Sequence, residues 1–335
     1  MDMILTTLDR YSHLKDALNK EIEKAFHYKD GNSFNTDFFQ LMKESNHKNC
    51  HLLLDENENL IAHIGVRPVT LHYKGHELKT LLLGGIITKE EFQGKGHFKK
   101  LYNHIKSIYK DNYSLAILWS DNMSVYKKLG YSQFGLTAVI GDTPTTEEEI
   151  RRRGYQHIAI QEIQKDKLEK KYNESYKETI SIKRSLTEWN DIQKITSMKI
   201  YMNDNDDYLF FEKGQDLKGI IHECSFANNK KELSKFKGLQ LLNPTPLDED
   251  SFYIHLAWGK VINTTGFSNF LRAITNSKVS ISEFLADTNK VTLTINNDSY
   301  LFKKEELLPL LFGPEQADEL KSLIPQIYIT GADSI

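Results

Sequence analysis

The stretch EEFQGKGHFKKLYNHIK, residues 90–106, places two glycines and a lysine in a short turn between an apolar run and a helical pattern. A helix N-terminus carries unsatisfied backbone N–H groups and a partial positive charge. Glycines just before it, here Gly94 and Gly96, permit positive φ and let a phosphate approach the backbone. This pattern predicts a phosphate site, and the alternative is an ordinary strand-to-helix turn with lysines around it.

A second glycine pair, Gly84 and Gly85, lies inside the apolar run TLLLGGIIT that precedes this turn. A glycine pair within a strand is typical of a bulge or a close backbone approach. Together the two features indicate an extended ligand, with a phosphate at the turn and a tail along the strand. The turn is neither a P-loop nor a dinucleotide fingerprint, because it lacks GxxxxGK[ST] and GxGxxG.

The motif QGKGHF resembles the Q/R-x-x-G-x-G/A signature of the GCN5-related N-acetyltransferases (GNAT), through Gln93, Gly94 and Gly96. Phe98 stands where the signature has glycine or alanine, and the enhanced intracellular survival branch also tolerates a larger residue there. Downstream, WSDNMSVYKKLGY at 119–131 resembles the helix of that family that carries an asparagine and a tyrosine. The first 140 residues predict the element order α-α-β-β-β-α-β-α-β, with the two helices over residues 8–29 and Asn35–Ser45. This order is similar to the same fold.

The resemblance implies an α+β protein with a mixed sheet. We expect a GNAT acetyltransferase domain over 1–145, a charge-dense helical connector over 146–180, and a second α+β domain over 181–335. In the enhanced intracellular survival branch, the later part combines a degenerate second GNAT domain with a sterol-carrier-like piece. Here it has no glycine-rich basic turn between an apolar strand and a helix, so we expect that it does not bind CoA. Its predicted elements include a strand at 251–262 and a hairpin turning at Asn296–Asn297.

The resemblance further implies acetyl-CoA as co-substrate and no metal. Backbone groups of three strand residues would pair with the pantetheine arm, the turn would hold the pyrophosphate, and one asparagine would contact the arm near the thiol. The implied cofactor-binding residues are Ile86, Ile87, Thr88, Gln93, Gly94, Lys95, Gly96, His97, Phe98 and Asn122.

Tyr126 matches the family's tyrosine that donates a proton to the leaving thiolate. A phenol with a pKa near 10 is protonated at neutral pH and can still donate. The alternative for Tyr126 is a core tyrosine on a helix that faces the sheet, beside Val125 and Leu129.

The sequence does not single out one residue as the general base that would deprotonate the amine. Asp121, His63 and His72 are candidates, although Asp121 is well placed to cap the helix that starts at Asn122. Relatives with appended domains suggest another route, in which the terminal carboxylate reaches into the active site. The apolar character of the last residue, Ile335, suits a buried tail.

Composition excludes several classes of protein. The chain has 335 residues, 39% of them hydrophobic and 27% charged, which fits a folded globular protein. Its net charge of −3 argues against a general nucleic-acid binder, and no apolar run approaches the ~20 residues of a membrane helix. The N-terminus lacks the basic head and apolar stretch of a signal peptide. Two distant cysteines, Cys50 and Cys224, are expected to be reduced, in a cytoplasmic protein.

These observations favour an N-acetyltransferase that transfers an acetyl group to a primary amine of a small molecule or peptide. An aminoglycoside-like compound, a polyamine and a lysine side chain stay open as acceptors. Two alternatives are a sensor or scaffold that binds acyl-CoA without turnover, and a structural protein with a vestigial site. The second domain would shape the acceptor pocket or an oligomer interface, so a homo-oligomer is also left open.

Overall fold

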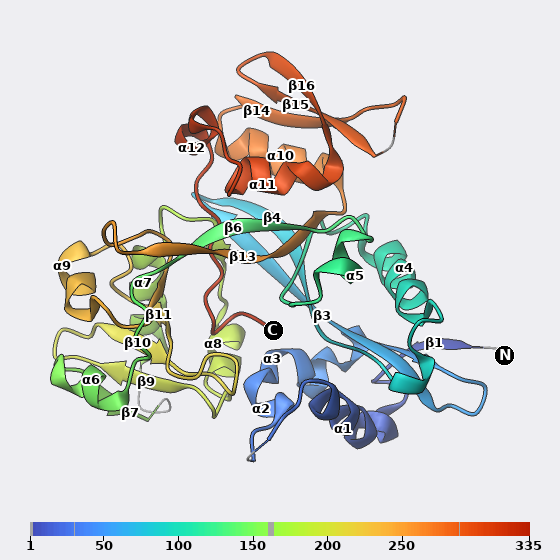
Figure 1. Ribbon diagram of the computed structural model, residues 1–335, viewed down its shortest axis with the longest axis horizontal. Coiled ribbons are helices and arrows are strands. Elements are labelled where there is room, and N and C mark those ends of the chain that lie inside the picture. The colour runs from blue at the N-terminus through green and yellow to red at the C-terminus, as the bar shows by residue number, and fades with distance from the viewer. Residues whose placement is uncertain (1–2, 30, 160–163, 288) are drawn as a thin grey trace.

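The computed structural model describes residues 3–29, 31–159, 164–287 and 289–335 (Figure 1). Its largest sheet runs in the order β1-β2-β3-β4-β5-β13-β6-β12, with β8 paired to β3. All neighbouring strands are antiparallel except β4 and β5. The strands are β1 (Ile4–Thr7), β2 (Cys50–Leu54), β3 (Leu60–Tyr73), β4 (His76–Thr88), β5 (Leu115–Leu118), β6 (Ser132–Val139), β8 (Ser181–Ile182), β12 (Leu242–Asn243) and β13 (Phe252–Val261).

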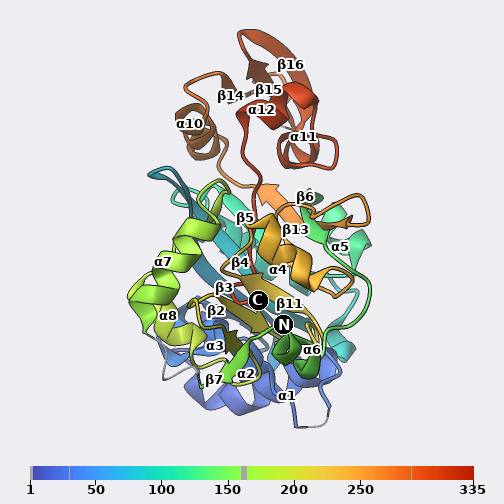
Figure 2. The same cartoon turned by 90° about the vertical axis from the view of Figure 1, so that its left-hand side faces the viewer.

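Helices cover the two faces of the first part of this sheet (Figures 1 and 2). On one face, α4 (His97–Tyr109) and α5 (Met123–Lys127) pack on a core that includes Leu83 and Leu118. On the other, α1 (Lys15–Ala25), α2 (Phe34–Asp37) and α3 (Phe39–Met42) pack on β3 and β4. The sheet is therefore buried from both sides where β4 approaches its end.

Three local predictions differ from the structure. The helical pattern over residues 8–29 yields only the shorter α1, preceded by a helical turn at Ser12–Leu14. The single helix expected over Asn35–Ser45 is broken at Phe38, whose φ of −119° and ψ of 43° leave the helical region. The short β1 was not predicted, since four residues give too little alternation to distinguish a strand from a loop.

A second, four-stranded sheet has the order β11-β10-β9-β7. Its strands are β7 (Gln156–Ile158), β9 (Lys199–Met202), β10 (Tyr208–Phe211) and β11 (Ile221–Cys224), all antiparallel. Its helices are α6 (Glu147–Arg152), α7 (Lys165–Ser175), α8 (Leu186–Ile192) and α9 (Lys230–Leu233). The sheet and its helices share an aromatic-rich core of their own around Trp189 and Phe210.

The third sheet is a meander, β14 (Val279–Glu283), β15 (Lys290–Ile295) and β16 (Asp298–Lys303), drawn at the top of Figure 1. The hairpin predicted at Asn296–Asn297 is confirmed, because both residues adopt the positive φ that such a tight turn needs. Helices α10 (Thr264–Ile274), α11 (Leu307–Phe312) and α12 (Asp318–Leu323) accompany it. None of the helices in the described ranges is long and apolar enough to cross a membrane.

The architecture confirms the predicted α+β class with a mixed sheet. The predicted strand at 251–262 exists as β13, and it lies between β5 and β6 of the first sheet. Strand β8 likewise adds to β3. Residues far downstream thus complete the sheet that the first 139 residues begin. The domain boundaries at residues 145 and 180 stay predictions.

A buried ionic cluster joins these parts. The guanidinium of Arg184, just after β8, donates to Glu223 on β11 at 2.8 and 2.5 Å and to Asp333 near the C-terminus at 2.9 Å. Arg67 on β3 donates to the carbonyl of Asp333 at 2.7 Å and pairs with its carboxylate at 3.3 Å. Burial alone would raise the pKa of Asp333, but the charges of Arg184 and Arg67 hold it below the usual range.

We expect Arg184→Met to lower the free energy of unfolding by about 3–5 kcal/mol, because it leaves two carboxylates buried without their partner. Lys321→Met removes an exposed pair with Asp318 and should cost less than about 1 kcal/mol. Urea unfolding of both variants provides the measurement. Equal losses would show that the cluster does not hold the fold together.

Candidate functional site

The central feature of the site is the point where β4 parts from β5. Their parallel pairing ends at Leu83 and Leu118, while β4 continues to Thr88. The register between β3 and β4 shifts at the same level, and Gly85 has a φ of 57°. The bulge predicted from the glycine pair is therefore confirmed, and it leaves the last residues of β4 unpaired on the β5 side.

The turn after β4 presents a row of free donors. Gly94 and Gly96 have φ values of 73° and 82°, and Gly96 is the N-cap of α4. Within the described part of the chain, the backbone N–H groups of residues 94–99 form no hydrogen bond. The Nζ of Lys95 donates to the carbonyl of Glu91 at 2.7 Å. What the turn leaves free for a ligand is thus its row of backbone N–H groups.

A groove of about 420 Å³ runs from the end of β4 along this turn to α5. Nine of the ten predicted cofactor-binding residues line it, and Lys95 does not. Tyr126 lines it as well. The nine are Ile86, Ile87, Thr88, Gln93, Gly94, Gly96, His97, Phe98 and Asn122. Their roles in binding stay predictions, but the structure brings the residues into one groove.

Tyr126 lies at the inner wall of this groove. Its ring meets that of Phe98 edge to face at 6.1 Å, and its side chain is buried. Burial raises the pKa of Tyr126, and a hydrogen bond with Ser120 partly offsets the rise. The phenol is therefore protonated at neutral pH, as a proton donor must be. Phe98, the departure from the family signature, packs as a wall beside the tyrosine.

The start of α5 differs from the prediction for Asp121. The N-cap residue is Asn122, and its side chain makes no capping hydrogen bond. Asp121 contributes only its backbone carbonyl, which accepts from the N–H of Met123 at 2.9 Å. The Asn122 carboxamide instead accepts from the Ser124 hydroxyl at 3.3 Å. Asp121 therefore does not cap the helix.

The C-terminal residue reaches the other face of the same strand. A Cβ atom placed on Gly84 would lie 3.2 Å from the carboxyl carbon of Ile335. Lys213 fixes this tail by donating to the carbonyls of Gly331 at 2.8 Å and Ser334 at 2.6 Å. Figure 1 shows the C-terminus at the centre of the molecule, between the first two sheets.

A second cavity, of about 230 Å³, adjoins this tail. Phe38, Trp119 and Ile335 contribute to its apolar lining, and Lys213 and Asp216 supply charges. Phe34, which is close to Phe38 in the sequence, packs in the core and does not line this cavity. The sequence did not predict that Lys213 and Asp216 belong to a cavity. Their segment, KGQDLKG, is typical of a turn, and no local pattern shows which part of the protein the loop between β10 and β11 contacts.

The two candidate histidine bases lie elsewhere. The ring of His63 is fully buried and bonds through Nδ1 to the carbonyl of Gly85 at 2.7 Å. Burial lowers its pKa to about 4, so it is neutral at pH 7. His72 lies near the hairpin end of β3, paired with Glu77, and lines neither cavity. Neither histidine is in contact with the groove.

Cys50 and Cys224 are both free and buried, as expected for reduced thiols. Across the described ranges, no cluster of three or more histidine, cysteine or acidic residues could hold a metal ion.

Comparisons with known proteins agree with this geometry. Residues 13–134 match the family model described as the acetyltransferase (GNAT) domain. The chain contains a GNAT domain. No curated protein sequence matches it.

Solved structures extend the likeness of fold beyond the GNAT domain. A GCN5-related N-acetyltransferase from Anabaena variabilis matches with a TM-score of 0.61 at 12% identity, covering 100% of both chains. Eis1 from Mycobacterium abscessus matches with a TM-score of 0.59 at 9% identity, again covering 100% of both. A GCN5-related N-acetyltransferase from Kribbella flavida matches with a TM-score of 0.56 at 10% identity, covering 90% of this chain and 84% of its own. At these identities the matches show a shared full-length fold.

We expect Lys213→Met to change how stability depends on pH. Burial, reinforced by the charge of Arg67, lowers the pKa of Lys213 to about 7, well below the unfolded value near 10.4. Between these values the unfolded chain binds the extra proton, so this residue makes the free energy of unfolding rise with pH by up to ~1.4 kcal/mol per unit.

In Lys213→Met this rise should disappear, while the exposed Lys218→Met control should retain it. Urea unfolding at several pH values between neutrality and pH 10 checks the slope. An unchanged slope in Lys213→Met would mean that the buried amine does not titrate in this range.

Proposed function

We propose that this protein is an acetyl-CoA-dependent N-acetyltransferase acting on a primary amine. The observation that carries the proposal is the groove at the end of β4. It joins an unpaired strand edge, a turn of free N–H groups and a buried tyrosine in one continuous wall. These three features suit the amide-bearing arm, the pyrophosphate and the thioester of one extended cofactor.

The cofactor would lie along the last turn of β4. Backbone groups of Ile86–Thr88 would form strand-like hydrogen bonds to the pantetheine amides. The N–H groups of residues 94–99, together with the positive end of the α4 dipole, would hold the pyrophosphate. Asn122 would contact the arm where it approaches Tyr126. The first 145 residues would then hold the cofactor, and both parts of the chain would contribute to the acceptor cavity.

The reaction would be direct aminolysis of the thioester. The amine lone pair attacks the carbonyl carbon, a C–N bond forms and the C–S bond breaks. Tyr126 donates its phenolic proton to the departing thiolate, and the terminal carboxylate of Ile335 accepts the proton released by the amine. Both groups lie where water is largely excluded, which strengthens their electrostatic interactions with the reacting atoms.

The acceptor would enter through the second cavity. Its aromatic and aliphatic lining would receive the carbon skeleton of a small molecule or side chain, with Asp216 available to a cationic group. The cavity meets β4 at Ile335, so an amine seated there approaches the thioester from the face opposite Tyr126.

We expect Tyr126→Phe to lower kcat by about 100-fold or more, the usual contribution of a positioned proton donor. Release of free thiol from acetyl-CoA, across a panel of amines, is the measurement. CoA binding should be retained, because the phenol touches only the thioester end. Tyr300→Phe, at an exposed tyrosine of β16, is the matched control.

Two outcomes distinguish the alternatives. If the wild-type protein binds CoA but turns over no amine in the panel, the groove belongs to a sensor or scaffold for acyl-CoA. If Tyr126→Phe retains full turnover, another group protonates the thiolate.

We expect deletion of Ile335 alone to abolish turnover while CoA binding persists, because the carboxylate would move back by one residue, ~3.8 Å. Ile335→Val, which keeps the carboxylate in place, should retain turnover. Comparing kcat and the Kd for CoA across the two variants separates chemistry from folding. Full turnover after the deletion would exclude the terminal carboxylate as the base.

A further inference from the structure

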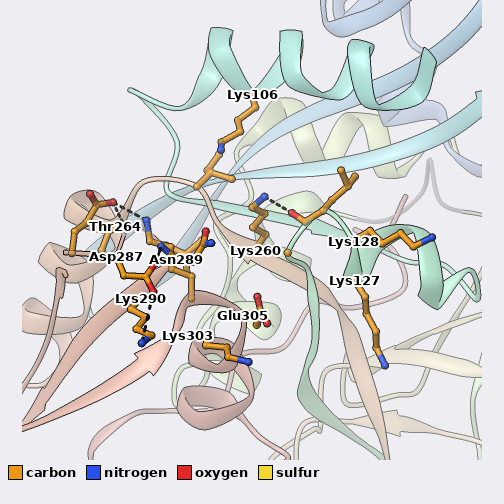
Figure 3. Close-up of a pocket in the computed structure, with 16 residues that line it drawn as sticks. Lys106, Lys127, Lys128, Lys260, Thr264, Asp287, Asn289, Lys290, Lys303 and Glu305 are labelled. Atoms are coloured by element: carbon orange, nitrogen blue, oxygen red, sulfur yellow. Dashed lines mark hydrogen bonds and ion pairs between the residues drawn. The ribbon is translucent and has the colours of Figure 1, made fainter. Parts of the chain in front are cut away.

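A large cavity lies at the opposite end of α4 from the phosphate turn. It has a volume of about 740 Å³ and is formed by α4, the turn after α5, β13 and the β14–β16 meander (Figure 3). Seven lysines and three carboxylates line it. The lysines are Lys106, Lys127, Lys128, Lys260, Lys290, Lys303 and Lys304. Such an excess of positive charge is unexpected in a chain whose net charge is −3.

The carboxylates neutralise only part of this charge. Glu283 pairs with Lys304 at 3.0 Å, and Asp287 lies 3.7 Å from Lys290. Among the described residues, Lys106, Lys127, Lys128 and Lys303 have no acidic partner within 4 Å. Figure 3 shows Lys106 projecting from α4 on one side and Lys303 lying on the other. The lysines without an acidic partner therefore line the cavity from several separate elements.

Lys260 is the innermost member and the most constrained. Its Nζ donates to the carbonyl of Leu129 and lies 5.6 and 5.8 Å from the ring centroids of Tyr102 and Tyr131. Burial, together with the charges of Lys106 and Lys304, lowers the pKa of Lys260 to about 8. A half-buried amine crowded by like charges is a position that a bound anion would stabilise.

We propose that this cavity binds a small molecule that carries two or more phosphate groups. Its volume falls within the range of small-molecule sites, about 300–1,000 Å³. Ammonium groups act as point charges that suit phosphate, and several elements contribute lysines to the lining. No aromatic side chain lines the cavity in the described part of the chain, so recognition would rest on phosphates rather than on a stacked nucleobase.

Inorganic tripolyphosphate is the probe, tested by isothermal titration calorimetry on the full chain with and without saturating CoA. We expect one tripolyphosphate site that remains available when CoA is bound. Its affinity should fall steeply as salt rises, because the contacts are ionic. Proton uptake should accompany binding near pH 8, since the anion raises the pKa of Lys260; titrations in buffers of different ionisation enthalpy measure that uptake.

The variant Lys106→Glu/Lys303→Glu should weaken tripolyphosphate binding by more than 10-fold. Lys15→Glu/Lys20→Glu, on the exposed side of α1, changes the net charge equally and should have little effect. CoA binding should be unchanged in both, which keeps the groove and the cavity separate. ATP serves as a second probe, and citrate tests whether any multivalent anion suffices.

Four outcomes would overturn the proposal. The first is tripolyphosphate binding no tighter than about 1 mM at low salt. The second is loss of the signal in saturating CoA, which would assign tripolyphosphate binding to the groove. The third is an equal loss of tripolyphosphate affinity in the two double variants, which would show that only net charge matters. The fourth is equally tight binding of citrate, which would show that the cavity does not select phosphate.

Discussion

The arrangement of the candidate site depends on the buried pairing of Arg184 with Glu223 and Asp333. All three side chains are completely buried, and each comes from a different segment of the chain. Burying an unpaired charge costs several kcal/mol. Moving any of these segments away would therefore either expose a charged side chain or leave it buried without its partner. The cluster therefore acts as a constraint on geometry more than as a source of net stability. It fixes the second sheet and the C-terminal tail relative to β3.

This constraint explains why the glycine pair of β4 is where it is. The tail held by Asp333 and Lys213 ends against Gly84, where any Cβ would approach the carboxyl carbon of Ile335 within 3.2 Å. The adjacent Gly85 takes a φ of 57°, which allows the bulge beside the groove. A residue with a side chain at either position would either displace the tail or strain the strand. The glycines thus shape both the groove at the end of β4 and the site of the tail.

The parts of the site that could be predicted from the sequence are those whose chemistry lies within a few neighbouring residues. The Gly94–Gly96 turn, the bulge at Gly84–Gly85 and the Asn296–Asn297 hairpin all follow from local backbone requirements. The groove residues lie together because one strand, one turn and one helix carry nearly all of them.

What the sequence did not predict rests on contacts between distant segments. Strand β13 enters between β5 and β6, and strand propensity alone does not say which neighbours a strand will take. Arg67 and Asp333 are 266 residues apart, and no local pattern marks them as partners. In the sequence, Lys213 cannot be distinguished from any other lysine in a turn, because its contacts with the C-terminal tail exist only in the folded protein. The cavity beside the tail depends on these contacts, so its lining could not be predicted from the sequence.

The two ends of α4 illustrate two ways in which a protein of negative net charge could hold an anion. At its N-terminus the donors are backbone N–H groups fixed by Gly94 and Gly96, reinforced by the positive end of the helix dipole. At its C-terminus the dipole is negative, and the ammonium groups of Lys106 and its neighbours supply the charge. Fixed dipoles in a narrow groove favour one ligand geometry, whereas flexible lysines tolerate several. The first arrangement suits a cofactor that must be placed for chemistry, and the second suits a ligand that only has to be bound.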